Sequence, residues 1–299
     1  MAIRIGTAER NSTFLSQGLA LKAVLDCNPA LAPVDILETA QASIQNAKRL
    51  HAGELEFGFM AANWIGRAKA GEPPFTEPID IRMAAPMNAG PLFFIARTDS
   101  LLRSVADLPG KRIAVGLRTS GMAQHAAVMF AALGVSMTDI EPHYLDFAEG
   151  AEAVASGAVD AQLQCPIPNK VMTELSQRVD IRVLPYAAGQ LDALLKAVPT
   201  YRRTVMPKGA LRGLDADVAQ PAVVNVLATH ARVAETAVRD VVAAVIAHAE
   251  ELATRNALFA GLDELIRDIA AGGHAQFEFG GVPLHPGALR AYREARLLT

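Results

Sequence analysis

The residues best suited to bind a small molecule are Thr119, Ser120 and Gly121, which stand between a short apolar run and an Ala-rich segment. The apolar run 113–115 predicts a buried strand, and residues 123–133 predict a helix. A strand that passes through Ser and Gly into a helix leaves backbone N–H groups unpaired at the positive end of the helix dipole, where a carboxylate or phosphate binds well. Taken alone, such a stretch is more often an ordinary Ser cap that holds no ligand.

Four more polar stretches come directly after predicted strands. They are residues 7–13, residues 39–46, Asn63 and residues 165–169. In open α/β sheets, ligands bind outside the carboxyl ends of the strands, and clefts between domains are common ligand sites. Each stretch alone is more often a surface connection, but two sheets that face each other would form a cleft lined by all five. The sequence therefore favours a ligand cleft.

Cys165 and His125 are the side chains near these stretches that could take part in covalent or proton-transfer chemistry. A thiol whose pKa is lowered by a His or a helix N-terminus is a nucleophile, and a His one turn into a helix can act as an acid or base. The commoner alternatives are a small buried filler beside two prolines for Cys165 and a helix-surface residue for His125. We favour these alternatives and predict no catalytic residue.

Composition and charge exclude several other functions. The net charge is −3 and the basic residues are scattered, which argues against a nucleic-acid partner. The longest uncharged run near the middle, 83–96, is interrupted by prolines and a glycine, so we expect no direct membrane insertion. Neither the two cysteines nor the seven histidines stand at metal-ligand spacing, and no phosphate-binding loop, dinucleotide fingerprint or Gly-x-Ser-x-Gly elbow is present. We expect no metal and no cofactor.

The order of the predicted elements indicates how the polar stretches are positioned. The first seventy residues repeat strand, polar loop and helix three times, and a similar series begins near residue 111. The predicted strands are 3–8, 34–39, 57–60, 81–87, 92–96, 113–115, 143–145, 161–164 and 181–184, and the predicted helices are 14–25, 42–51, 61–69, 123–133, 148–156 and 169–176. Strands that alternate with helices predict a parallel sheet covered on both faces.

Two short stretches indicate that the halves of the chain are built alike. In 53–57 and in 157–161, a predicted helix ends at Gly, an acid follows, and a buried strand begins. The length of 299 residues also suggests roughly two domains. We expect an α/β protein with two lobes, each a mainly parallel sheet flanked by helices, joined by a hinge. Lobe 1 is predicted at 1–98 plus 190–299 and lobe 2 at 99–189, with the ligand cleft between them.

The C-terminal third is predicted to be mostly helical. Residues 191–198 and 218–227 read as helix-rich connecting material, and 232–252 has the pattern of one long amphipathic helix. A rigid turn segment, 280–288, precedes a last helix at 289–295.

Four segments carry a family resemblance. They are Gly6-Thr7 with the polar loop up to Leu15, the segment 39–46, the segment 107–116, and the Pro-Leu-His-Pro-Gly-Ala ending at 283–288, which is the most specific. With these segments the chain resembles the periplasmic solute-binding subunits of TRAP transporters, in their TAXI branch, over essentially its whole length.

The resemblance is incomplete in the loops that would contact a ligand. The family's Gly-rich first loop carries Glu9 and Arg10 here, and its Gln-Ser-Asp after the third strand is Ala-Ala-Asn at 61–63. Met122 stands where the family's Gly-Ser-Gly-Thr segment has Thr. Several polar side chains that would meet an amino-acid-like ligand are therefore replaced, and we expect an apolar or aromatic carboxylate rather than glutamate. The side chains that favour such a ligand are Phe14, Met60, Trp64 and Met122.

The resemblance implies a type II periplasmic binding protein that closes on a small organic anion and delivers it, in the periplasm, to the subunits of a TRAP-type membrane transporter. Ser120 and the N–H groups of the two residues after it would hold the carboxylate, and Thr13, Ser43 and Asn63 would contact it from lobe 1. The full set of predicted ligand-binding residues is Thr7, Glu9, Asn11, Ser12, Thr13, Phe14, Ser43, Asn46, Met60, Asn63, Thr119, Ser120, Gly121, Met122 and Cys165.

Two other functions stay open. No signal peptide is apparent, since residues 2–7 already read as a strand, so the protein is either cytoplasmic or has lost its signal peptide. That absence, the unpaired cysteines and the unusual Glu9 and Arg10 motivate a cytoplasmic enzyme, decarboxylase-like or other, on the same bilobal scaffold. A cytoplasmic ligand sensor without chemistry is the other alternative.

Overall fold

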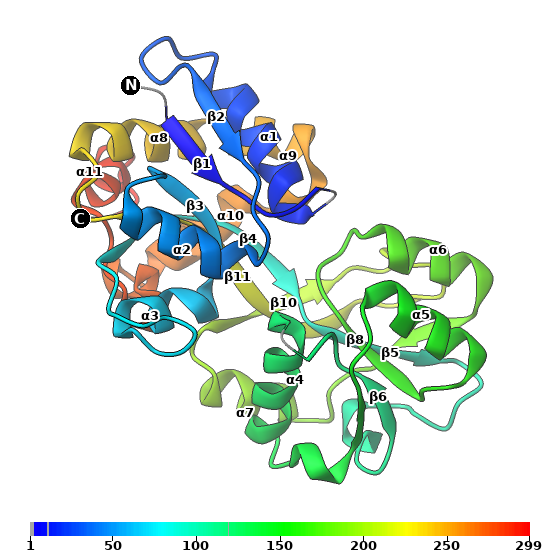
Figure 1. Cartoon of the computed structure of the whole chain (residues 1–299). Helices are drawn as coiled ribbons and strands as arrows, with labels where there is room; N and C mark the ends of the chain where they lie inside the picture. Colours follow the sequence, from blue (N-terminus) through cyan, green and yellow to red (C-terminus); the bar gives the residue numbers. More distant parts are fainter. Residues whose placement is uncertain (1–2, 11, 119) are drawn as a thin grey trace. The chain divides into compact units, whose positions relative to one another are not determined.

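The computed structural model of the chain describes residues 3–10, 12–118 and 120–299 (Figure 1). The chain divides into two compact units. Unit 1 extends up to Ala89 and resumes at Val224, and unit 2 is Gly90–Val223. Each unit contains a sheet flanked by helices, so the predicted α/β fold with two lobes is confirmed.

The sheet of unit 1 has the strand order β2-β1-β3-β11, and β4 also pairs with β11. Its strands are β1 (Ile3–Gly6), β2 (Val34–Leu37), β3 (Phe57–Ala61), β4 (Ile81–Pro91) and β11 (Val218–His230). β1 is parallel to both β2 and β3, and β11 is antiparallel to β3. The carboxyl ends of β1, β2 and β3 therefore meet at one edge, which we call the carboxyl edge of unit 1.

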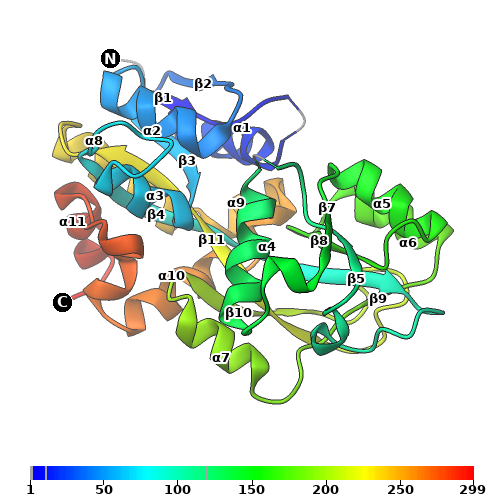
Figure 2. The ribbon, with the colours of Figure 1, turned by 60° about the horizontal axis from the view of Figure 1, so that its bottom comes forward.

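The helices of unit 1 cover this sheet, and α2 packs beside both β3 and α3 (Figure 2). They are α1 (Thr13–Leu25), α2 (Ala42–Ala52), α3 (Ala62–Ala70), α8 (Glu235–Ala247), α9 (Ala249–Arg255), α10 (Leu262–Ala271) and α11 (Pro286–Glu294), with short 3-10 turns at Ala257–Phe259, His274–Phe277 and Phe279–Gly281. α1 begins where the Ser12 hydroxyl oxygen accepts the N–H of Leu15 at 3.1 Å. Leu21 and Leu25, one turn apart on α1, are fully buried in the core of unit 1.

The sheet of unit 2 has the order β7-β6-β8-β5-β9. Its strands are β5 (Phe93–Arg97), β6 (Arg112–Ala114), β7 (Glu141–His143), β8 (Ala161–Gln164) and β9 (Ile181–Val183), and β10 (Tyr201–Met206) pairs with β11. The helices are α4 (Gly121–Ala132), α5 (Phe147–Ser156), α6 (Lys170–Arg178) and α7 (Gln190–Ala197), with 3-10 turns at Val105–Asp107 and Met137–Asp139. β6 is parallel to β7 and β8, whereas β5 is antiparallel to β8 and β9. The ends of β6, β7 and β8 form the carboxyl edge of unit 2.

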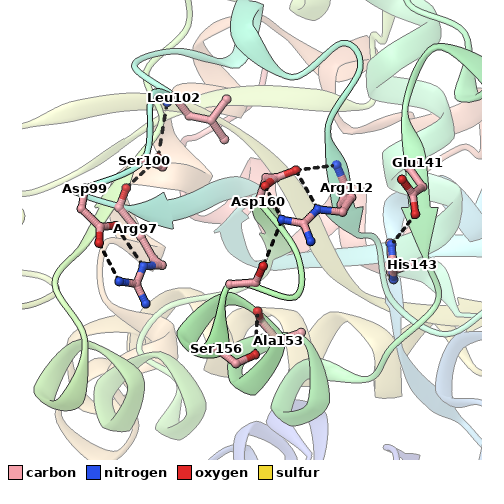
Figure 3. Close-up of polar contacts among 11 residues, drawn as sticks. Arg97, Asp99, Ser100, Leu102, Arg112, Glu141, His143, Ala153, Ser156 and Asp160 are labelled. Carbon is pink, nitrogen blue, oxygen red and sulfur yellow. Dashed lines mark hydrogen bonds and ion pairs between the residues drawn. The ribbon is translucent and has the colours of Figure 1, made fainter.

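The two units share one construction where their parallel strands begin. In unit 2, Arg112 on β6 donates to both carboxylate oxygens of Asp160, just before β8, and to the carbonyl of Gly157, where α5 ends (Figure 3). In unit 1, Arg4 on β1 makes the same set of bonds to Glu56 and to the glycine where α2 ends. The closest contact in each ion pair is 2.7 Å. These matched bonds confirm the prediction that the two halves are built alike.

Three segments differ from the predicted elements. Residues 218–227, predicted as helix-rich connecting material, form most of β11, because a strand buried at nearly every position lacks the alternation that marks a strand in sequence. Residues 81–91 form one strand where the sequence predicts a Pro/Gly break. The predicted single helix at 232–252 is two helices, because the backbone leaves helical geometry at His248, with φ −114° and ψ 22°.

The boundaries between the units also differ from the predicted ones. The sequence places them at 98/99 and 189/190, whereas the chain passes from one unit to the other within β4 and within β11. β5 belongs to unit 2 because it is hydrogen-bonded to both β8 and β9, and β10 belongs to unit 2 because it pairs with the first part of β11. The first boundary, between Ala89 and Gly90, coincides with the Pro/Gly positions that the sequence reads as a break between two strands.

Candidate functional site

The carboxyl edge of unit 1 contains two helix starts without a side-chain cap. The N-cap residue is Gln41 for α2 and Ala61 for α3, and neither helix has a side-chain cap bond among the described residues. The first N–H groups of a helix have no partner within the helix, and they carry the positive end of its dipole. The starts of α2 and α3 are therefore suited to bind an anion.

Ser43 connects these two helix starts. It lies in the first turn of α2, and its Oγ accepts the N–H of Ala61 at 3.1 Å, at the start of α3. A hydroxyl that accepts one bond can still donate its own hydrogen. Asn63, in the first turn of α3, is half-buried, and its Oδ1 is buried without a partner among the described residues. Ser43 and Asn63 thus bring polar groups to the same helix starts.

The backbone at the start of α2 is strained. Gln41 has φ +60° and Ala42 has φ +33°, and both lie in the left-handed region that favours glycine. Such conformations cost about 1–3 kcal/mol each, persist where the surrounding structure imposes them, and gather at functional sites. The strain gives a second, independent reason to place a functional site at this helix start. Neither residue type signals a left-handed conformation, so the sequence gives no warning of it.

Two predicted ligand contacts in unit 1 make internal hydrogen bonds, and the Oδ1 of one of them, Asn46, is buried without a partner among the described residues. Asn46 is fully buried, and its Nδ2 donates to the carbonyl oxygens of Thr7, at 2.8 Å, and Phe59, at 2.9 Å. Thr7 is also fully buried, and its Oγ1 donates to the carbonyl oxygen of Leu37 at 3.3 Å. These bonds fix the carboxyl ends of β1, β2 and β3 relative to one another. Both residues therefore position the loops that a ligand would meet.

The apolar residues predicted for ligand contact lie in the core of unit 1. Phe14 packs on Phe59 with ring centroids 5.7 Å apart, and Met60 is fully buried. Trp64 is 6% exposed, with an edge-to-face contact to Phe75. The contribution of these residues to ligand binding stays a prediction. Of the remaining predicted residues in unit 1, Glu9 is exposed, Ser12 and Thr13 are half-buried, and Asn11 lies outside the described residues.

A buried amide cluster, absent from the sequence-based prediction, lies close to where the chain leaves and re-enters unit 1. The Oδ1 of Asn88, on β4, accepts from Gln17 on α1 and from Asn225 on β11, each at 3.2 Å. Gln17 is fully buried, and its Oε1 has no partner among the described residues. One signal was available in the sequence: Gln17 interrupts the apolar face of α1, three residues after Phe14 and four before Leu21.

The carboxyl edge of unit 2 has side-chain caps. Ser120 Oγ accepts the N–H of Ala123 at 3.3 Å at the start of α4, and α5 and α6 are capped by Asp146 and Asn169. Before α4 stands Gly116, with φ +90°, and a Cβ there would lie 2.6 Å from the Cβ of Met122. Glycine is thus required for the loop to pack on the start of α4. Thr119 lies outside the described residues.

His125 and Cys165 are buried in unit 2. His125 Nδ1 is 2.6 Å from the hydroxyl of Tyr201, and burial lowers the pKa of His125 to about 4. Burial also raises the pKa of the Cys165 thiol to about 12. A nucleophilic cysteine needs a lowered pKa, so the environment of Cys165 is the opposite of an activating one. His125 is an interior residue, whereas the sequence favours the helix surface for it.

Gln164, next to Cys165, is fully buried at the end of β8. Its Oε1 and Nε2 both lack a partner within the described part of the chain. Gln162, on the same face of the strand, donates its Nε2 to the carbonyl of Phe147 at 3.0 Å. The sequence-based prediction names Cys165 and omits Gln164.

Two kinds of feature are not found among the residues that the structure describes. No group of three or more His, Cys, Asp or Glu side chains is placed to hold a metal ion. None of the described helices combines the length and the apolar character needed to cross a bilayer.

Known proteins share this architecture. A model of the NMT1-like family matches residues 5–295. The periplasmic aliphatic sulphonate-binding protein SsuA from Escherichia coli is 19% identical with a TM-score of 0.50, and the match covers 98% of this chain and 82% of that chain. The periplasmic sulfonate-binding protein SsuA from Methylobacillus flagellatus KT is 14% identical with a TM-score of 0.57, and the match covers 99% of this chain and 95% of that chain. A Xanthomonas citri protein solved with bound ATP is 12% identical with a TM-score of 0.55, and the match covers 99% of this chain and 98% of that chain.

At these identities the solved structures establish the fold, which is that of periplasmic binding proteins with two α/β lobes. The family match spans nearly the whole chain, including both units and the loops at both carboxyl edges. The chain belongs to the NMT1-like family.

Proposed function

We propose that this protein is a solute-binding protein that captures a small organic anion and delivers it to a membrane transporter. The observation that carries the proposal is the pair of uncapped helix starts at the carboxyl edge of unit 1, with Ser43 between them. N–H groups at helix starts bind carboxylate, sulfonate and phosphate oxygens without a metal or cofactor. Asn63 supplies a further polar side chain at the same edge.

Unit 2 contributes to the same anion when the two units close on it. Ser120 and the N–H groups of Gly121 and Met122 are the contacts that we propose on this side. Shifting an open–closed equilibrium from 1:99 to 99:1 requires about 5.5 kcal/mol of differential binding. A charge-assisted hydrogen bond contributes about 1.5–3 kcal/mol, so a few bonds made only in the closed form are enough.

The ligand is proposed to be a carboxylate or a sulfonate with an apolar or aromatic body. Met122, where the TAXI proteins have Thr, favours the apolar body. A sulfonate is included among the proposed ligands because two of the similar structures are sulfonate-binding proteins. Glutamate is a poorer candidate, since the polar positions that suit an amino acid are replaced.

The membrane partner is proposed from two indications. The sequence segments that resemble TAXI proteins favour a TRAP-type transporter, and one similar structure is named as part of a sulfonate ABC transporter. Both transporter classes place the binding protein in the periplasm, which is the location that we propose. Copurification of the protein, loaded with its ligand, with candidate membrane subunits of each class distinguishes them.

Native mass spectrometry of the purified protein tests the proposed function. We expect a fraction of the molecules to carry one small organic acid, and the Ser43→Ala variant to carry less of it. The acid, released and incubated again with fresh protein, should be recovered unchanged. Conversion of the acid into another compound would favour an enzyme on the same scaffold, and the absence of any bound or stabilising anion would contradict the proposal.

A further inference from the structure

Gln164 presents an anomaly that no element of the proposed site explains. It is 0% exposed, and neither its Oε1 nor its Nε2 has a partner in the described portion of the chain. A buried amide without hydrogen bonds destabilises a folded protein, and native proteins keep few of them. Gln162, two residues earlier on the same face, has its Nε2 satisfied by the Phe147 carbonyl.

Gln164 lies at the carboxyl edge of unit 2. It is the last residue of β8, which runs parallel to β6 with Ala114 paired to Gln162. Gln162, two residues earlier on the same face of β8, reaches the carbonyl of Phe147 at the start of α5. Gln164 is thus nearer than Gln162 to the carboxyl edge, where the helix starts of unit 2 lie.

We propose that Gln164 determines ligand specificity: the ligand carries, besides its anionic group, a planar group that donates one hydrogen bond and accepts another. A primary carboxamide, a ureide and a lactam all have this edge, whereas a trans secondary amide does not, because its N–H and C=O point in opposite directions. Its donor pairs with Oε1 and its acceptor with Nε2, which is the arrangement of two amides side by side. This inference rests on the proposed function, because it assumes that an anion binds at the carboxyl edges.

The stability of the ligand-free protein gives the first test. Gln164→Met keeps the length of the side chain and removes both unpaired polar atoms, so we expect its Tm to rise by about 2 °C. The matched control Gln162→Met removes one unpaired atom, Oε1, but also takes the Nε2 donor from the Phe147 carbonyl, so its Tm should not rise. A lower Tm for Gln164→Met would mean that the amide is satisfied within the protein and would overturn the inference. Gln164→Leu serves as the second variant if Gln164→Met fails to fold.

Calorimetry with paired anions gives the second test. Succinamate and N-carbamoyl-β-alanine each carry a carboxylate and a donor–acceptor group, and pentanoate is their apolar partner. Wild-type protein should bind at least one of the two about tenfold more tightly than pentanoate, and Gln164→Met should lose that difference while it still binds pentanoate. Equal affinities in the wild type would overturn the inference and leave the proposed function intact. If none of the three anions binds, the inference fails, and native mass spectrometry decides the proposed function.

Discussion

The helices that follow the parallel strands differ in how many of them are capped in the two units. In unit 1, Ser12 caps α1, whereas α2 and α3 start without a side-chain cap among the described residues. In unit 2, α4, α5 and α6 all start with a side chain that accepts a backbone N–H: Ser120, Asp146 and Asn169. The two units are otherwise built alike. In each, an arginine–carboxylate ion pair connects two parallel strands, β1 with β3 in unit 1 and β6 with β8 in unit 2.

This difference bears on the function that we propose. A capped helix has part of its N-terminal hydrogen-bonding capacity already used, whereas an uncapped one keeps more of it. Under the proposed function, the helix starts of unit 1 therefore provide the principal anion contacts. In unit 2, the side chain of Gln164 is a buried amide whose two polar atoms are both unpaired among the described residues.

The largest expected effect is a loss of stability when the hydrogen bonds that support the carboxyl edge of unit 1 are removed. Asn46→Ala removes the donor for two carbonyl oxygens, those of Thr7 and Phe59. Each buried carbonyl left unpaired costs about 1–3 kcal/mol, so the free energy of unfolding should fall by about 2–5 kcal/mol in urea denaturation. The matched control is Asn63→Ala, which removes an unpaired Oδ1 and should change stability little. Equal losses in the two variants would contradict the supporting role of Asn46.

The second effect concerns α4 and the interior of unit 2. His125 is held neutral by burial, with a pKa of about 4 against the ordinary 6.5. Between pH 6.5 and 4 the unfolded chain binds a proton that the folded chain does not, so stability is fully present above pH 6.5 and falls as the pH drops to 4. Relative to His125→Gln, the wild type should lose about 3 kcal/mol over this range. Parallel stability–pH curves for the two proteins would show that His125 is protonated in the native state.

The smallest effect on stability is expected at the cap of α4. Ser120→Ala removes the acceptor for the Ala123 N–H and should cost about 1 kcal/mol, measured by urea denaturation. The same variant should weaken the binding of any carboxylate ligand. It should do so less than Ser43→Ala, because Ser43 serves the uncapped helix starts. The reverse order of affinities would assign the principal contacts to unit 2.

The sequence predicts the fold well where local rules decide it. The Gly–acid–strand stretches at 53–57 and 157–161 predict matched halves, and Ser120 caps a helix as its position suggests. β11 is not predicted, because a continuously buried strand has no alternation. The boundary at Val224 is not predicted either, because it lies inside this strand.

The candidate site is less readable from the sequence. Asn46 is predicted as a ligand contact, and the structure adds a supporting role, because its Nδ2 donates to the carbonyl groups of Thr7 and Phe59 while its Oδ1 has no partner among the described residues. The amide cluster joins Gln17, Asn88 and Asn225 across separations of 71 and 137 residues, so only the tertiary fold brings them together. Sequence shows which side chains are polar, and the fold shows which of them are already paired.

The most direct test of the central claim is a ¹⁵N NMR titration of the protein with hexanoate and with hexanesulfonate, following the backbone amides at the helix starts. We predict saturable shifts at Ala42, Ser43, Ala62 and Asn63, and little change at the capped starts of α5 and α6. Unchanged amides at the starts of α2 and α3 would contradict the claim, and so would equal shifts at all helix starts.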